Sequence, residues 1–184
     1  NELSKLQWKA IEVVVEAESQ SKIKHFIWRR LNGLLPVNAL VFYRPHHGDP
    51  LCDGCGEHNE SIEHMFFQCS TAQEVWKMAP IQWDGLIGQT GNFTVWWTAM
   101  LEASCRIEGR EHIELTMNIL WQIWKRRNEW KFNAKRRHPW KTVNKAQQEW
   151  QEQASAWSKE TMIPEDAERD GEEVEPVEVR RDEM

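Results

Sequence analysis

The sequence lacks any run of about 18 to 20 uninterrupted apolar residues, the length that a helix needs to cross a bilayer. It also opens without the basic and then apolar segment of a secretory leader. We therefore expect an intracellular protein, in the nucleus or the cytoplasm, with no membrane partner. Because the first residue is Asn1 rather than methionine, we favour a piece of a longer reading frame, such as a module of a polyprotein.

Sustained alternation of apolar and polar residues, the pattern of a half-buried strand, is also missing, and the short run from Val13 to Val15 fits a helix or a strand. Apolar residues recur instead at three- and four-residue steps, which predicts a mainly α fold. The first such helix is expected over residues 22–35. Its apolar face comprises Ile23, Phe26, Ile27, Leu31 and Leu34.

Two shorter helices should follow. Residues 38–43 form a short helical segment after the break at Pro36. Ser70 and Gln73 match a capping box that opens a helix through Trp76.

The second half of the chain should be helical and rich in tryptophan. Gly85, Gly88 and Gly91 indicate an irregular connector over residues 80–92. Pro139 is expected to end a long helix, and a last helix should span about residues 141–159. The long helical stretch carries Trp96, Trp97, Met100, Leu101, Leu115, Ile119, Leu120, Ile123 and Trp124, and the last helix repeats Val143, Trp150 and Trp157 at seven-residue steps.

The negative charge of the chain is concentrated at its end. Residues 158–184 carry 11 acidic and 4 basic side chains, whereas residues 1–157 carry 18 acidic and 19 basic ones. The tail has little apolar surface to bury, so we expect it to be disordered. The expected organisation is an unassigned segment (1–21), a domain that contains three of the four cysteines (22–78), a helical linker region (79–157) and this acidic tail (158–184).

The four cysteines are few enough to examine one by one. Cys52, Cys55, His64 and Cys69 form the pattern C-x2-C-x8-H-x4-C, which predicts one zinc ion held in a tetrahedron. Gly54 and Gly56 tolerate the positive φ angles that a metal-wrapping turn requires. Four protein ligands leave no open position for water or substrate, so the zinc should be structural.

Other readings of these residues stay open. A lone C-x2-C can be a redox pair or part of a disulfide framework, although no βαβ pattern and no oxidising context support these alternatives. His58 is a substitute ligand if His64 lies on the surface. Cys105 falls in a helical stretch and is expected to be a buried apolar residue.

The order of motifs over residues 22–78 resembles the zinc-binding domain of plant LINE-type (non-LTR) retrotransposon reverse transcriptases. The resemblance implies zinc ligation by the same four residues and no catalytic role for them. Its motifs are Phe26-Ile27-Trp28-Arg29, Leu34-Leu35-Pro36, Leu40, Arg44, Cys52-x2-Cys55, Glu60-Ser61, Glu63-His64-Met65-Phe66, Cys69 and Val75-Trp76.

A second segment extends this resemblance. Residues 121–128, with Phe132, look like the linker that joins the zinc region to a ribonuclease H domain in such polyproteins. Polymerase and ribonuclease H chemistry need carboxylates fixed on a sheet to hold two metal ions, and the sequence shows no such arrangement. We therefore expect a protein that is not an enzyme.

Two basic segments that also contain aromatic residues suggest binding to RNA or single-stranded DNA, because cations release counterions from phosphates and aromatics stack on bases. The alternative is a scaffold that packs against a polymerase or ribonuclease H domain, with the twelve tryptophans as its apolar surface. The candidate nucleic-acid residues are Lys22, Lys24, Arg29, Arg30, Lys125, Arg126, Arg127, Lys131, Lys135, Arg136 and Arg137.

Overall fold

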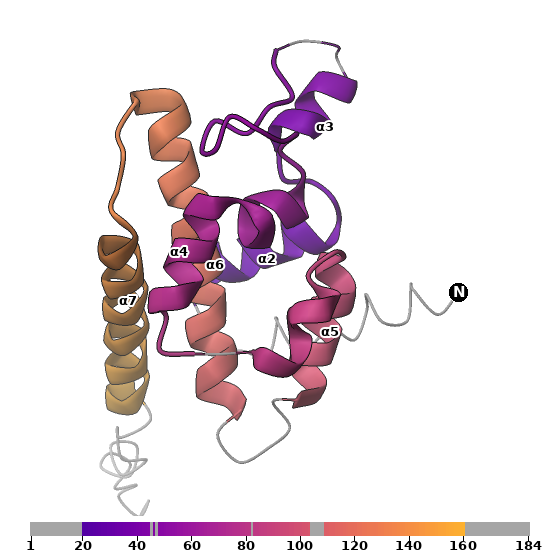
Figure 1. The fold of residues 1–184 in the computed structure, drawn as a ribbon. Coiled ribbons are helices and arrows are strands. Elements are labelled where there is room, and N and C mark those ends of the chain that lie inside the picture. The colour runs from indigo at the N-terminus through magenta and orange to yellow at the C-terminus, as the bar shows by residue number, and fades with distance from the viewer. Residues whose placement is uncertain (1–19, 45, 47, 82, 104–108, 161–184) are drawn as a thin grey trace, which may run out of the picture.

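The computed structural model describes residues 20–44, 46, 48–81, 83–103 and 109–160. This part of the chain is almost entirely helical, as the apolar spacing predicted, and its only β-type pairing is an isolated bridge between Leu51 and Asn59. The elements are α2 (Ser21–Leu31), α3 (Asn38–Tyr43), the π-helical η1 (His64–Gln68), α4 (Ser70–Met78), the 3-10 helix η2 (Asp84–Gln89), α5 (Phe93–Ala103), α6 (Gly109–Asn133) and α7 (Pro139–Glu160) (Figure 1).

The long helix α6 lies at the centre of the fold. After a short turn, α7 runs back along α6, and α4 packs against α7 (Figure 1). The helices α2 and η1 pack against α6, while α5 contacts both α6 and η2. No helix among the described residues is long and apolar enough to span a membrane.

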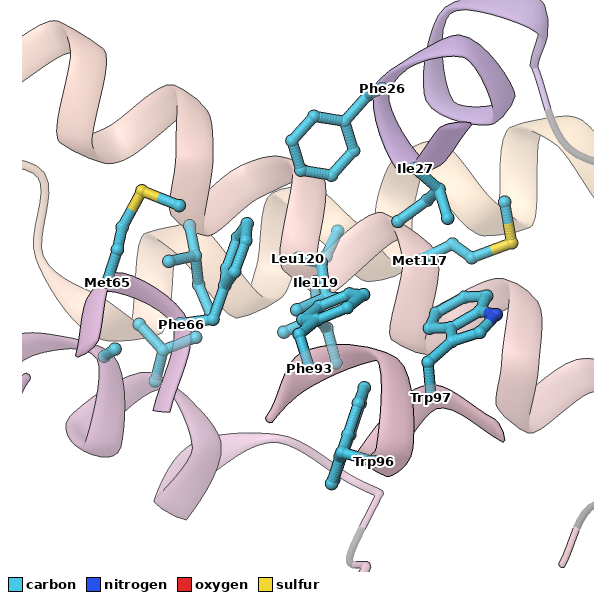
Figure 2. Packing of buried hydrophobic residues seen from close by; sticks show 14 of the residues in the cluster. Phe26, Ile27, Met65, Phe66, Phe93, Trp96, Trp97, Met117, Ile119 and Leu120 are labelled. Atoms are coloured by element: carbon cyan, nitrogen blue, oxygen red, sulfur yellow. The ribbon is translucent and has the colours of Figure 1, made fainter. Parts of the chain in front are cut away.

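A single apolar core joins these helices. Figure 2 shows Phe66 from η1 and Phe93 and Trp97 from α5 meeting Ile119 and Leu120 of α6. The Phe66 ring lies 5.7 Å from that of Phe93, so aromatic side chains from segments distant in sequence pack directly on each other. The core therefore contains residues from both sides of the domain boundary expected at residue 78, although the boundaries themselves stay predictions.

Most of the described tryptophans serve this core rather than an outer surface. Trp96 and Trp97 are buried, whereas Trp28 and Trp140 are exposed. Five more are partly buried and pack against the core: Trp76, Trp83, Trp121, Trp124 and Trp150.

The helix expected over residues 22–35 ends earlier, at Leu31. Gly33 adopts φ +64°, and the N–H groups of Gly33 and Leu34 donate to the carbonyls of Arg30 and Arg29 at 3.0 and 2.8 Å. This is a Schellman ending, which glycine favours because it has no Cβ. The assignment of Leu34 to the buried helix face is therefore wrong, and its side chain is exposed.

The capping box assigned to Ser70 is also wrong. Cys69 is the N-cap residue of α4, no side chain caps the helix, and Ser70 is its first residue. The carbonyl of Cys69 accepts hydrogen bonds from Ala72 and Gln73 at 2.9 and 3.0 Å. Cys69 is thus both a predicted metal ligand and the residue at which α4 starts.

Two further boundaries differ from expectation. The connector over residues 80–92 contains η2, and Pro139 begins α7 rather than ending α6, which stops at Asn133. A proline suits the first turn of a helix because that N–H has no partner there. Val13 to Val15, Cys105, the side chain of Trp157 and nearly all of the acidic tail lie outside the described residues.

The buried Phe66 side chain provides a test of this core. Phe66→Ala should lower the free energy of unfolding by about 3–5 kcal/mol, because it leaves a cavity where the side chain is 0% exposed. The matched control is Phe132→Ala, which removes a side chain that is 72% exposed. Urea unfolding checks both, and equal losses for the two variants would contradict this packing.

Candidate metal centre

Four side chains converge on one point between the cysteine loop, η1 and α4. The ligand atoms of Cys52, Cys55, His64 and Cys69 all lie within 4.8 Å of one another. The first two residues come from the loop between Leu51 and Asn59, His64 begins η1, and Cys69 directly precedes α4. These are the four ligands that the sequence pattern predicted.

The spacing of the donor atoms fits zinc. The sulfur atoms of Cys52 and Cys69 are 3.7 Å apart, and the sulfur of Cys55 lies 3.3 Å from Nε2 of His64. A tetrahedral zinc ion with ordinary bond lengths separates two sulfurs by about 3.8 Å and a sulfur from a nitrogen by about 3.6 Å. These two separations are close to those of a zinc tetrahedron, and the four donor atoms are grouped as one zinc ion requires.

The two glycines of the turn have different roles. Gly56 adopts φ +71° and donates its N–H to the carbonyl of Cys52 at 2.7 Å, as a metal-wrapping turn requires. Gly54 does not have a positive φ, so that part of the prediction is wrong. A Cβ at Gly54 would lie 3.3 Å from the sulfur of Cys69 and 3.1 Å from the hydroxyl of Thr71, so the residue is small because space is short.

The structure decides between the two histidines. His64 is buried within the ligand group, whereas His58 is exposed and lies outside it. The ring of His58 stacks on that of His64 at 5.5 Å, and its carbonyl accepts a hydrogen bond from Cys52 N–H at 2.8 Å. His58 thus supports the ligands without being one.

The thiols of Cys52 and Cys69 titrate as a pair. The hydrogen bond between them lowers the pKa of Cys69 to about 4 and, together with burial, raises the pKa of Cys52 above its ordinary value. The two thiols therefore share a proton, which zinc must displace to bind both sulfurs. Because this proton competes with the metal, zinc affinity falls as the pH is lowered.

The cysteine loop is fixed to α6 by a buried ion pair. Arg127 Nε lies 3.1 Å from both carboxylate oxygens of Glu60, and its NH2 lies 2.5 Å from Oε1. Glu60 also accepts the backbone N–H of Asn38 at 2.9 Å. The Glu60 side chain is fully buried and that of Arg127 is 9% exposed, so both charges depend on each other for neutralisation.

A second set of contacts holds the turn at Asp53. The Asn38 side chain donates to Asp53 at 2.9 Å, and Lys131 Nζ lies 3.2 Å from the same carboxylate. Burial opposes ionisation of Asp53, but these two hydrogen bonds, together with the positive charges of Lys131 and Arg127, outweigh it and hold its pKa below the ordinary value. Trp130 Nε1 donates to the backbone carbonyl of Asp53 at 2.7 Å.

Several predicted nucleic-acid residues are therefore engaged within the fold. Arg126 donates to the carbonyls of Thr71 and Arg137 at 2.6 and 2.7 Å, and burial lowers its pKa. Lys22 and Lys125 lie near Glu149. Four others pair with carboxylates: Arg30 with Glu63, Arg127 with Glu60, Lys131 with Asp53 and Arg137 with Glu129.

Arg30 belongs to the core. Burial lowers its pKa to about 10, while the charge of Glu63 opposes the shift, so the guanidinium stays charged at neutral pH. Its NH2 group lies 3.0 Å from Oε1 of Glu63, and its Cζ atom lies 4.3 Å from the centre of the Phe93 ring. The same Glu63 oxygen accepts the backbone N–H of Phe93 at the start of α5. Arg30 thus links α2 to α5.

The remaining predicted residues face outward. Arg29, Lys135 and Arg136 are exposed, and Lys24 is half-buried. The guanidinium of Arg136 lies 4.3 Å over the ring of Trp130. The structure adds His138, Trp140 and Lys141, which are exposed beside the same turn between α6 and α7. Their basic and aromatic character was visible in the sequence, which places them directly after Arg137.

The ligand set can be tested by metal content. The chain purified under reducing conditions should hold one zinc, and Cys52→Ser and His64→Ala should lose it, because three ligands hold zinc more weakly than four. His58→Ala is the matched control and should keep the metal. Loss of zinc in His58→Ala with retention in His64→Ala would contradict the assigned ligand, and absence of zinc from the unaltered chain would contradict the site.

Comparison with known proteins supports this geometry. Residues 2–76 match the family described as zinc-binding in reverse transcriptase, and the match includes most of the segment 1–21 that the sequence left unassigned. No curated protein and no solved structure matched the chain. An origin in plant LINE-type elements stays a prediction. Residues 2–76, which carry the four residues positioned to hold one zinc ion, are thus similar to the zinc-binding domains of reverse transcriptases.

Proposed function

We propose that the chain is a non-catalytic zinc module of a retrotransposon reverse transcriptase and that it binds RNA or single-stranded DNA. The family supports the link to reverse transcription. The zinc site supports a structural role for the metal, because four protein ligands complete its coordination. Zinc of this kind supplies on the order of 10–16 kcal/mol of apparent free energy to small domains, enough to order a loop with few apolar residues.

The proposed nucleic-acid surface consists of the exposed residues at the turn between α6 and α7, which we call the turn cluster. No carboxylate of the described residues lies within ion-pair distance of its three cations. Lys141 Nζ lies 5.7 Å from the centre of the Trp140 ring, which is 47% exposed. The turn cluster consists of Lys135, Arg136, His138, Trp140 and Lys141.

The turn cluster combines the two chemistries that single strands require. Its cations can replace the counterions of phosphates, and the exposed ring of Trp140 can stack on an unpaired base. The zinc loop fixes its position, because Arg126 connects Thr71 beside Cys69 to the carbonyl of Arg137. The metal would thus act on nucleic-acid binding by holding this turn in place.

A scaffold role is the second candidate, and a different surface favours it. A groove of about 460 Å³ lies between α3 and α6, lined in part by Pro36, Val41, Trp124 and Phe132. Val41 and Phe132, which are 40% and 72% exposed, both line this groove, and exposed apolar side chains that lie together are typical of a partner site. An apolar interface there would be nearly insensitive to salt.

The salt dependence of binding separates the two candidates. Affinity for a 12-nucleotide single-stranded RNA should fall steeply as salt is raised, since each phosphate contact releases counterions. Removing two contacts with Lys135→Ala/Arg136→Ala should reduce the slope of log affinity against log salt by about 1.4. Fluorescence anisotropy at several salt concentrations measures this slope.

The matched control removes two exposed cations elsewhere, with Arg44→Ala/Lys77→Ala. It changes the net charge of the chain equally and should leave the slope near that of the unaltered protein. Equal slopes for the two double variants would contradict the turn cluster. The absence of any RNA or DNA binding at low salt would leave the scaffold role as the supported function.

A further inference from the structure

Three lysines from three helices lie within ion-pair distance of a buried carboxylate on α7. Glu149 Oε1 lies 3.8 Å from Lys125 Nζ of α6 and 4.0 Å from Lys145 Nζ of α7. Its Oε2 lies 3.9 Å from Lys22 Nζ of α2. We call Lys22, Lys125 and Lys145 the lysine cluster. Lys145 was not among the residues that the sequence predicted.

These contacts are ion pairs without hydrogen bonds. All three distances exceed the range of about 2.7–3.2 Å for an N–H to oxygen hydrogen bond. Glu149 Oε2 is buried and accepts no hydrogen bond from the described residues. The ammonium groups therefore keep donors for another acceptor. The lysine side chains are 49%, 35% and 45% exposed for Lys22, Lys125 and Lys145, so solvent and ligands can reach them.

Neutralising Glu149 does not account for three lysines. A buried carboxylate is costly without a partner, and one cation offsets its charge. Among the residues that the structure describes, the cluster holds three cations around one anion, an excess of two positive charges at the junction of α2, α6 and α7. Such an excess repels itself unless a further anion lies nearby.

The position of the cluster relates it to the turn cluster. Lys141 and Lys145 lie four residues apart on α7, hence on one helix face and about 6 Å apart along its axis. On α2, Lys22, His25 and Arg29 likewise share a face. His25 stacks on Trp28 at 5.8 Å, and Trp28 is 38% exposed. Basic and aromatic groups thus continue from the turn along α7 to α2.

We propose that the lysine cluster is a second phosphate site, which binds the phosphodiester backbone of the same single strand whose other end contacts the turn cluster. This inference rests on the proposed function. The strand would follow α7, with one or more phosphates at Lys22, Lys125 and Lys145 and a base near Trp28. The bound ligand supplies the negative charge that Glu149 alone does not.

Lys145→Ala tests the site, because Lys22 and Lys125 remain to neutralise Glu149. With the 12-nucleotide single-stranded RNA, this variant should bind more weakly at low salt and lower the log–log salt slope by about 0.7, the contribution of one phosphate contact. Its thermal unfolding should match that of the unaltered chain. Lys77→Ala, on α4, is the control and should leave the RNA affinity unchanged. Lys22→Ala gives an independent second variant if Lys145→Ala does not fold.

The outcomes distinguish this inference from the proposed function. Weaker binding in Lys145→Ala, with an unchanged melting temperature, supports the second site. A lower melting temperature with unchanged RNA affinity means that the lysine only stabilises the fold, which overturns the inference. If Lys145→Ala and Lys22→Ala bind like the control while Lys135→Ala/Arg136→Ala is impaired, the turn cluster stands and the lysine cluster falls. If the unaltered chain binds no RNA, both proposals fall.

Discussion

The buried ion pair between Arg127 and Glu60 connects two parts of the chain that differ in their content of apolar side chains. One is the cysteine loop, which has few apolar side chains and carries two of the metal ligands. The other is α6, around which the apolar core is built. Because both charges are buried, removing either side chain leaves the other as an unpaired buried charge, which destabilises the fold. The loop and the helix are therefore expected to form and to unfold together.

This coupling gives the zinc ion a role beyond its own loop. Cys69 is both a ligand and the N-cap residue of α4, and Arg126 connects the adjoining Thr71 to the turn after α6. Trp130 and Lys131 hold the backbone and side chain of Asp53. These contacts connect the segments that carry the metal ligands directly to the exposed turn.

The metal ligands could be predicted because their signal is local: Cys52, Cys55, His64 and Cys69 lie within one short segment at spacings that suit one ion. The helices were also predicted, because the spacing of apolar residues indicates which face of each helix is buried. Arg127 could not be separated from exposed arginines, because Glu60 lies 67 positions away in the sequence. The early end of α2 was readable in principle from Gly33, whose left-handed conformation stops the helix before Leu34.

The most direct test of the account is the stability of zinc-loaded Arg127→Met in urea. Arg127→Met should lose about 3–5 kcal/mol of unfolding free energy relative to the unaltered chain, because Glu60 is left buried and charged. The double variant Glu60→Gln/Arg127→Met should recover part of that loss, since it removes the unpaired charge. Arg136→Met, at an exposed position, should unfold like the unaltered chain. Equal stability of Arg127→Met and Arg136→Met would contradict the claim that this ion pair joins the zinc loop to α6.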